Sequence, residues 1–153
     1  MPVDADAAKA YAFAPIEVTV ERGKLVFFAA ATGQDDPVYR DPAAARAAGH
    51  PDVPVPPSYY FSLELSGPQP FDYLVELGVD LRHVLHGEQS FTYHRLAHAG
   101  DTLVLRPRIT EVASKKGGAL ELLTKTTEIT RDGSLVAEAT AVIVVRHPVG
   151  ARS

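Results

Sequence analysis

The chain has 153 residues, 46% of them hydrophobic and 22% charged, with a formal net charge of −4 and no cysteine. This length suits one domain with a real core, and the lack of cysteine excludes a disulfide scaffold, a thiolate nucleophile and a Cys-based zinc site. The sequence shows no block of like charges, no signal peptide and no apolar run long enough to span a bilayer, so we expect a cytoplasmic protein that binds neither nucleic acid nor membrane.

The first half of the chain predicts helices. Residues 21–32, "ERGKLVFFAAAT", predict a helix with apolar residues on most faces, hence largely buried, that Gly33 ends. Pro42 opens a short alanine-rich helix that ends at Gly49. The prolines of residues 51–57 then enforce an extended backbone in the segment that leads to the next element, which we call the proline-rich approach. The alternation of apolar residues over 58–66 would fit a strand, but we favour a helix that begins directly after the prolines.

The second half predicts an antiparallel sheet. Segments rich in Thr and in β-branched residues are separated by the turn sequences "HAGD", "SKKGG" and "TRDG". Helices first and then an antiparallel meander indicate an α+β domain with the helices on one face of the sheet. Strands this long suggest a strongly curved sheet that wraps one buried helix. A short helix is also expected at "FDYLVELG", and the expected strands cover residues 85–95, 101–113, 119–130 and 134–146.

Several motifs resemble the MaoC-like hydratase/dehydratase branch of the hotdog fold. They are "FAAATGQDDPVYRD", "VPVPPSYYF", "LHGEQSFTYHRLAHAGDTL" and "DGSLVAEATAVIVVR". The chain is most similar to the N-terminal type of this family, the type I fatty-acid-synthase-like dehydratases. The resemblance implies a single hotdog domain over residues 1–153, with a curved antiparallel sheet around a central helix. It also implies that two hotdogs pair side by side, as a homodimer or a heterodimer.

The resemblance further implies an acyl thioester substrate, carried on coenzyme A or an acyl carrier protein. The implied reaction is the reversible, (R)-specific addition of water across a 2,3-double bond, with no metal and no other cofactor. Such a hydration needs a base for water, an acid for the α-carbon and hydrogen-bond donors for the thioester oxygen. In active family members an Asp and a His on one loop supply the base and the acid.

The same loop departs from the family pattern in this chain. The motif places Gln34 at the Asp position and Tyr39 at the His position, with Asp36 and Pro37 between them. An amide cannot act as a base, and a phenol with an ordinary pKa of about 10 is a poor two-way proton carrier. The Asp/His dyad is therefore substituted. Gln34 is expected to position substrate or water, while Tyr39 is either a polar pocket residue or plain packing.

Other side chains are candidates for the missing chemistry. Asp36 is either a catalytic carboxylate or a turn and cap residue. Alternation along a strand places His86, Glu88 and His94 on one face, with His86 and Glu88 about 7 Å apart, so they are either an acid/base pair or part of a polar interface. His86 is our candidate for catalysis, and Glu88 and His94 for substrate binding.

The remaining polar candidates lie at turns and at a helix start. Ser58 and Tyr59 begin the central helix, where the resemblance implies backbone donors to the thioester oxygen, although core packing is the simpler role of Tyr59. His50 and His98 are expected at the surface. His94 and His98 fall on a strand and a turn, so we expect no metal site.

The favoured interpretation is part of a hydro-lyase: a subunit that shapes the acyl pocket and pairs with a hotdog subunit carrying Asp and His. One alternative is a self-sufficient homodimeric lyase that uses Tyr39, Asp36 or His86. Further alternatives are a non-catalytic acyl-thioester binding module and a thioesterase with Asp35 or Asp36 as the base.

Overall fold

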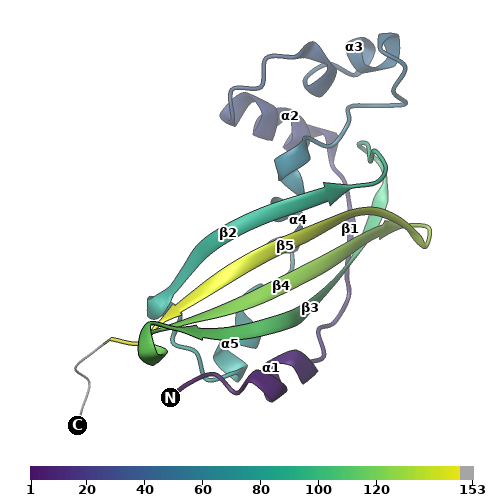
Figure 1. Ribbon diagram of the computed structural model, residues 1–153. Helices are drawn as coiled ribbons and strands as arrows, with labels where there is room; N and C mark the ends of the chain where they lie inside the picture. The colour runs from purple at the N-terminus through teal and green to yellow at the C-terminus, as the bar shows by residue number, and fades with distance from the viewer. Residues whose placement is uncertain (149–153) are drawn as a thin grey trace.

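The computed structural model describes residues 1–148; residues 149–153, which the predicted domain includes, lie outside the described part of the chain. Within residues 1–148 five strands form one antiparallel sheet in the order β1-β3-β4-β5-β2. Figure 1 shows the four long strands as a single twisted and curved layer. The strands are β1 (Ile16–Thr19), β2 (Val84–Tyr93), β3 (Thr102–Lys115), β4 (Leu120–Arg131) and β5 (Ser134–Arg146).

The helices are short, and the first half of the chain holds nearly all of them. The structure confirms the predicted helices at residues 21–32, 42–49, 58–66 and 71–78. None of the helices in residues 1–148 is long and apolar enough to cross a membrane. The α-helices are α1 (Ala5–Ala10), α2 (Arg22–Ala31), α3 (Pro42–Ala47), α4 (Tyr60–Glu64) and α5 (Asp72–Glu76), and the 3-10 helices are η1 (Pro37–Tyr39), η2 (Pro57–Tyr59), η3 (Leu81–His83) and η4 (Lys116–Gly118).

One face of the sheet carries the core, as predicted. Along β5, alternate residues from Ala137 to Val145 are buried, while the residues between them are partly exposed. Ala137 and Ala139 are small, so α4 can approach the sheet closely and bury Tyr60 and Leu63 in the same apolar cluster. This packing confirms the hotdog arrangement of a curved sheet around a short central helix.

Helix α2 differs from its prediction, because only one of its faces is buried. Leu25 and Ala29 are its buried residues, whereas Phe27 is 75% exposed. Figure 1 shows α2 and α3 beyond one end of the sheet rather than under it. Phe28 meets Tyr59 edge-on, with ring centroids 5.1 Å apart. The expectation of a largely buried helix is therefore wrong, since this helix has the core on one side and, within residues 1–148, no covering element on the other.

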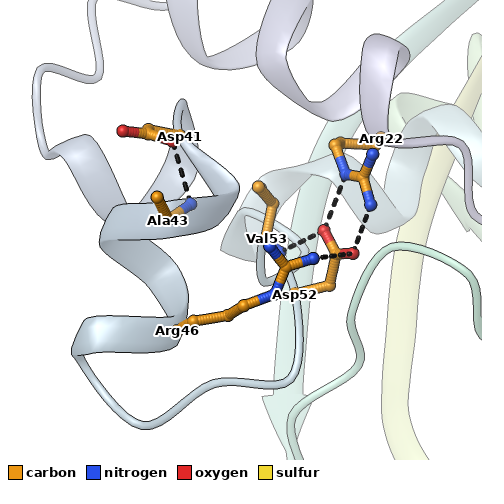
Figure 2. A network of polar contacts seen from close by, with 6 residues as sticks. All are labelled: Arg22, Asp41, Ala43, Arg46, Asp52 and Val53. Carbon is orange, nitrogen blue, oxygen red and sulfur yellow. Dashed lines mark hydrogen bonds and ion pairs between the residues drawn. The ribbon is translucent and has the colours of Figure 1, made fainter.

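An ion-pair network holds α2 and α3 against the proline-rich approach (Figure 2). The Arg22 guanidinium donates from Nε to Asp52 Oδ1 at 2.9 Å, and Arg46 Nη2 lies 3.8 Å from Asp52 Oδ2. Asp52 also accepts the Val53 backbone N–H at 2.7 Å. The Arg22 hydrogen bond holds the pKa of Asp52 well below its usual range. The network fixes the two ends of the segment that includes the Gln34–Tyr39 loop.

Candidate functional site

The loop between α2 and α3 uses most of its polar groups on itself. Gln34 Oε1 accepts the Asp36 N–H at 3.2 Å, and Asp36 Oδ1 accepts the Val38 N–H at 3.0 Å at the start of η1. Arg40 Nε donates to the Gln34 carbonyl at 2.6 Å and its guanidinium pairs with Asp35 at 3.4 Å. Asp36 is thus an exposed cap residue here, in agreement with the simpler of its two predicted roles.

Tyr39 faces a cavity of about 380 Å³, which we call the Tyr39 cavity. In its wall, Tyr93 donates from its hydroxyl to the Pro57 carbonyl at 2.7 Å. His94 Nε2 lies 2.9 Å from Glu138 Oε2, so a carboxylate orients this imidazole. Burial raises the pKa of Tyr60 to about 12, which keeps that phenol neutral. The lining residues are Tyr39, Val55, Pro57, Tyr60, Tyr93, His94, Arg95 and Leu96.

A bulge at Gly87 separates His86 from Glu88. The pairing of β2 with β5 shifts there, so that His86 faces Ile143 while Glu88 faces the adjacent residue, Val142. Neighbouring residues of β5 point to opposite sides of the sheet, which puts His86 on the helix-facing side and Glu88 on the other. The expected face shared by His86 and Glu88 is therefore wrong, and the two do not form an acid/base pair. Glu88 stays on the outer side, where His94 meets Glu138.

Only glycine fits at the bulge. A Cβ built on Gly87 would lie 2.8 Å from Val144 Cγ2 and 3.1 Å from the Val142 carbonyl oxygen. A glycine inside a strand pattern is a sequence sign of a bulge, and it is the sign that the strict alternation of our prediction overlooked.

His86 lies in a second cavity, of about 350 Å³, between the central helix and the sheet. This apolar cavity lies within the range of about 300–1,000 Å³ that holds small ligands. His86 Nε2 is 3.0 Å from the Glu88 carbonyl oxygen and its ring meets Phe61 edge-on at 5.0 Å. The lining residues are Phe61, Glu64, Leu65, Pro70, Phe71, Tyr73, Leu74, Leu81, Val84, Leu85, His86, Lys125, Ala141 and Ile143.

The apolar cavity borders an open edge of the sheet. Strand β2 ends the strand order, and within residues 1–148 it pairs with β5 alone. Four large apolar residues of the cavity wall are also well exposed: Leu65, Phe71, Leu81 and Leu85. An unpaired strand edge beside exposed apolar side chains is the physical signature of an interface.

The predicted catalytic residues do not converge. Tyr39 and His86 line different cavities, and Asp36 lines neither of them. At the helix start the Tyr59 N–H donates to the Pro56 carbonyl at 3.0 Å, and the Tyr59 ring is buried in the core. That amide is already occupied, which leaves Ser58 as the exposed candidate. Among residues 1–148, His, Asp and Glu side chains form no group of three able to hold a metal ion.

Residues 7–139 match a family described as "FAS1-like, dehydratase domain region". The chain belongs to the FAS1-like dehydratase family. A UPF0336 protein of Thermobifida fusca (strain YX) is 40% identical over 133 residues, which are 86% of this chain and 85% of that protein. The fold and the family therefore agree with those that the sequence motifs suggested.

Solved structures of dehydratases share the fold. The C-terminally truncated HadBC (3R-hydroxyacyl-ACP dehydratase) complex from Mycobacterium tuberculosis matches with a TM-score of 0.74 and 25% identity, over 86% of this chain and 91% of the other. A MaoC-like dehydratase matches with a TM-score of 0.78 and 24% identity, over 92% of this chain and 43% of the other. These likenesses confirm the hotdog fold of this member of the FAS1-like dehydratase family.

Two histidines expected at the surface instead contact each other. His50 Nδ1 and His98 Nε2 are 3.1 Å apart, and both residues are half-buried between the proline-rich approach and the β2–β3 connection. Burial lowers the pKa of His98 from its ordinary value of 6.5, and the nearby His50 lowers it further. Sequence reasoning missed this pair because its members are far apart in the chain.

The His50–His98 contact predicts a specific acid sensitivity. Since the folded-state pKa of His98 is lowered, its contribution to stability is complete above about pH 6.5 and is lost as the pH falls through the lowered value. The free energy of unfolding of the variant His98→Gln should be about 1 kcal/mol below that of the wild type at neutral pH. On acidification it should fall by less than that of the wild type. Urea unfolding at about pH 7.5 and about pH 5.5 measures both effects. Equal pH dependence in the two proteins would contradict the assignment.

Proposed function

We propose that this FAS1-like dehydratase is the pocket-bearing subunit of an (R)-specific 2-enoyl-thioester hydratase or 3-hydroxyacyl-thioester dehydratase. One observation carries the proposal. An apolar cavity opens beside the free edge of β2, whereas the loop that would hold the acid and the base has Gln34 and Tyr39 instead. The acyl chain would enter the cavity, and a second hotdog subunit would supply Asp and His.

The chemistry of the site supports this division of labour. The apolar cavity has an apolar wall against which the methylenes of an acyl chain can pack. Burial of apolar surface is the main source of affinity for an acyl chain. The Tyr39 cavity offers a phenol, an oriented imidazole and Arg95, which suit the polar part of a coenzyme A or carrier-protein thioester. The proposed reaction needs acid, base and oxyanion donors and no metal, flavin or nicotinamide.

The proposed partner is a second hotdog subunit that pairs along β2. Strand β2 has ten residues, Val84–Tyr93, and its outer edge has no neighbour in the described part of the chain. Addition of a partner strand there would extend the sheet and cover the exposed mouth of the apolar cavity. The similar HadBC structure from Mycobacterium tuberculosis is a 3R-hydroxyacyl-ACP dehydratase complex. A homodimeric lyase is less well supported, because Tyr39 and His86 line different cavities.

Co-expression tests the pairing. The tagged chain is co-expressed with a hotdog subunit that carries Asp and His in its loop. Native mass spectrometry gives the stoichiometry of the purified product, and titration with dodecanoyl-CoA measures its binding of the acyl thioester. We expect a one-to-one complex that binds the acyl thioester. A stable homodimer of this chain that binds dodecanoyl-CoA and excludes the second subunit would contradict the proposal.

The substituted loop makes a gain of function testable. We expect the double variant Gln34→Asp, Tyr39→His to acquire weak hydration of crotonyl-CoA, about 10²-fold above the uncatalysed background, because a base and an acid return to the loop. The matched control Gln34→Asn, Tyr39→Phe keeps similar side-chain sizes without the chemistry and should gain nothing. Absorbance of the 2-enoyl thioester follows the reaction. No gain in the variant Gln34→Asp, Tyr39→His would mean that the loop no longer presents these positions to the substrate.

A further inference from the structure

A largely buried ion pair lies on the helix-facing side of the sheet. Lys125 Nζ is 3.0 Å from Glu64 Oε2, and the two side chains are 14% and 6% exposed. On β4, Lys125 lies opposite two buried apolar residues, Ile109 of β3 and Ala141 of β5. Lysine and glutamate are almost never buried unless they are paired, so the fold holds a charged pair where the pattern of the strand would place an apolar residue.

The pair separates two cavities. The apolar cavity lies on one side of it. On the other side lies a cavity of about 570 Å³, the N-terminal cavity, between the segment Tyr11–Val18 and the loop of residues 66–70. Four residues line both cavities and form the partition between them: Glu64, Pro70, Tyr73 and Lys125.

The partition is built to stay closed. The Lys125 ammonium lies 5.3 Å from the centre of the Tyr73 ring, close enough for a cation–π contact. Burial, together with Glu64, raises the pKa of Tyr73, so its phenol stays neutral beside the pair. A methylene chain that crossed the partition would have to separate the two ions inside the protein, which leaves each charge buried without its partner.

We propose that the Glu64–Lys125 pair is the end wall of the acyl pocket and sets the upper limit of the acyl-chain length. The inference rests on the proposed function and adds the substrate class: acyl thioesters whose chain ends within the apolar cavity. Longer chains are refused by the charged wall, although an N-terminal cavity large enough to hold them lies directly behind it.

The direct test removes the two charges of the wall and keeps the volume of its side chains. The double variant Glu64→Leu, Lys125→Met replaces the pair by apolar residues, a change that folded proteins often tolerate well. Isothermal titration of the full chain with butyryl-, octanoyl-, dodecanoyl- and palmitoyl-CoA gives the chain-length profile. For wild type we expect affinity to rise with chain length and then to fall. The double variant should bind palmitoyl-CoA about tenfold more tightly, with butyryl-CoA unchanged, because added methylenes become buried.

A second variant shifts the limit in the opposite direction without changing the pair. Ala141 lines the apolar cavity opposite Lys125, so Ala141→Leu fills the cavity and should move the preferred chain length downward. The control Asp6→Leu, Lys9→Met removes an exposed ion pair of α1 that lines neither cavity, and it should leave the profile unchanged. Circular dichroism of each variant establishes folding. If the double variant does not fold, the chain-length profile of Ala141→Leu serves as the test.

The outcomes separate this inference from the proposed function. If wild type binds none of the acyl-CoAs, the acyl pocket itself is wrong and the proposed function fails with it. If wild type binds them but shows no upper limit, or if the folded variants leave that limit in place, the end wall is wrong and the pocket stands.

Discussion

Replacing Lys125 alone by methionine is expected to lower the free energy of unfolding by about 3–5 kcal/mol. The substitution leaves the Glu64 carboxylate, which is 6% exposed, without its partner inside the protein. Desolvation of an unpaired charge is among the largest penalties that a single substitution can cause. Replacing both partners, as Glu64→Leu, Lys125→Met, should restore stability to the wild-type value or above it, because no buried charge remains.

Urea unfolding at about pH 7 measures these differences. The control is Lys9→Met, which breaks the exposed Lys9–Asp6 pair of α1 and should cost less than about 1 kcal/mol. A Lys125 variant as stable as the Lys9 variant would show that the buried pair is worth no more than a surface pair. A double variant as unstable as the single one would show that the site needs its charges to fold.

The substitution Leu85→Lys is expected to weaken pairing with the proposed catalytic subunit by about 30-fold or more. Leu85 belongs to the edge strand β2, is 47% exposed and lines the apolar cavity. A charge there would be buried without a partner when a second subunit adds to the edge, and inward-pointing or edge lysines are how proteins prevent such strand addition. The isolated chain should stay folded, because the side chain is exposed before pairing.

Val75→Lys is the matched control for this prediction. Val75 lies on α5, is 55% exposed and lies outside the lining of the apolar cavity. Isothermal titration of each variant with the second subunit gives the dissociation constants. Equal weakening by both variants would indicate a general effect of added charge, and unchanged affinity of the Leu85 variant would place the interface elsewhere.

The strands of the second half were predictable because their sequence encodes them locally. Each has β-branched residues, and turns with glycine separate consecutive strands along the chain. The predicted meander is wrong for the first of these strands, because β2 pairs with β5 and not with β3, the next strand along the chain. Strand β1 was not predicted, since its four residues Ile16–Thr19 are held by pairing with β3, from Ile16 opposite Leu105 onward. Short segments of this kind owe their structure to partners far away in the sequence.

The candidate site was predictable only in part, for the same reason. The prediction that Gln34 and Tyr39 replace the base and the acid rests on a local motif, and the local contacts of the loop agree with a turn. The position of His86 depends on the bulge at Gly87, where a side chain would meet Val144 of the neighbouring strand. The apolar cavity and its end wall combine residues of α4, α5, β2, β4 and β5, so no single stretch of sequence contains them.

The hydration rate of crotonyl-CoA, measured for the chain alone and for its complex with an Asp/His-bearing hotdog subunit, tests the central claim most directly. We predict no turnover above background for the chain alone and turnover by the complex. Replacing the partner's loop histidine by glutamine should reduce the rate of the complex by about 10²–10⁴-fold, the usual contribution of a general acid or base. Turnover by the chain alone at an ordinary enzymatic rate, about 1–10³ s⁻¹, would contradict the account.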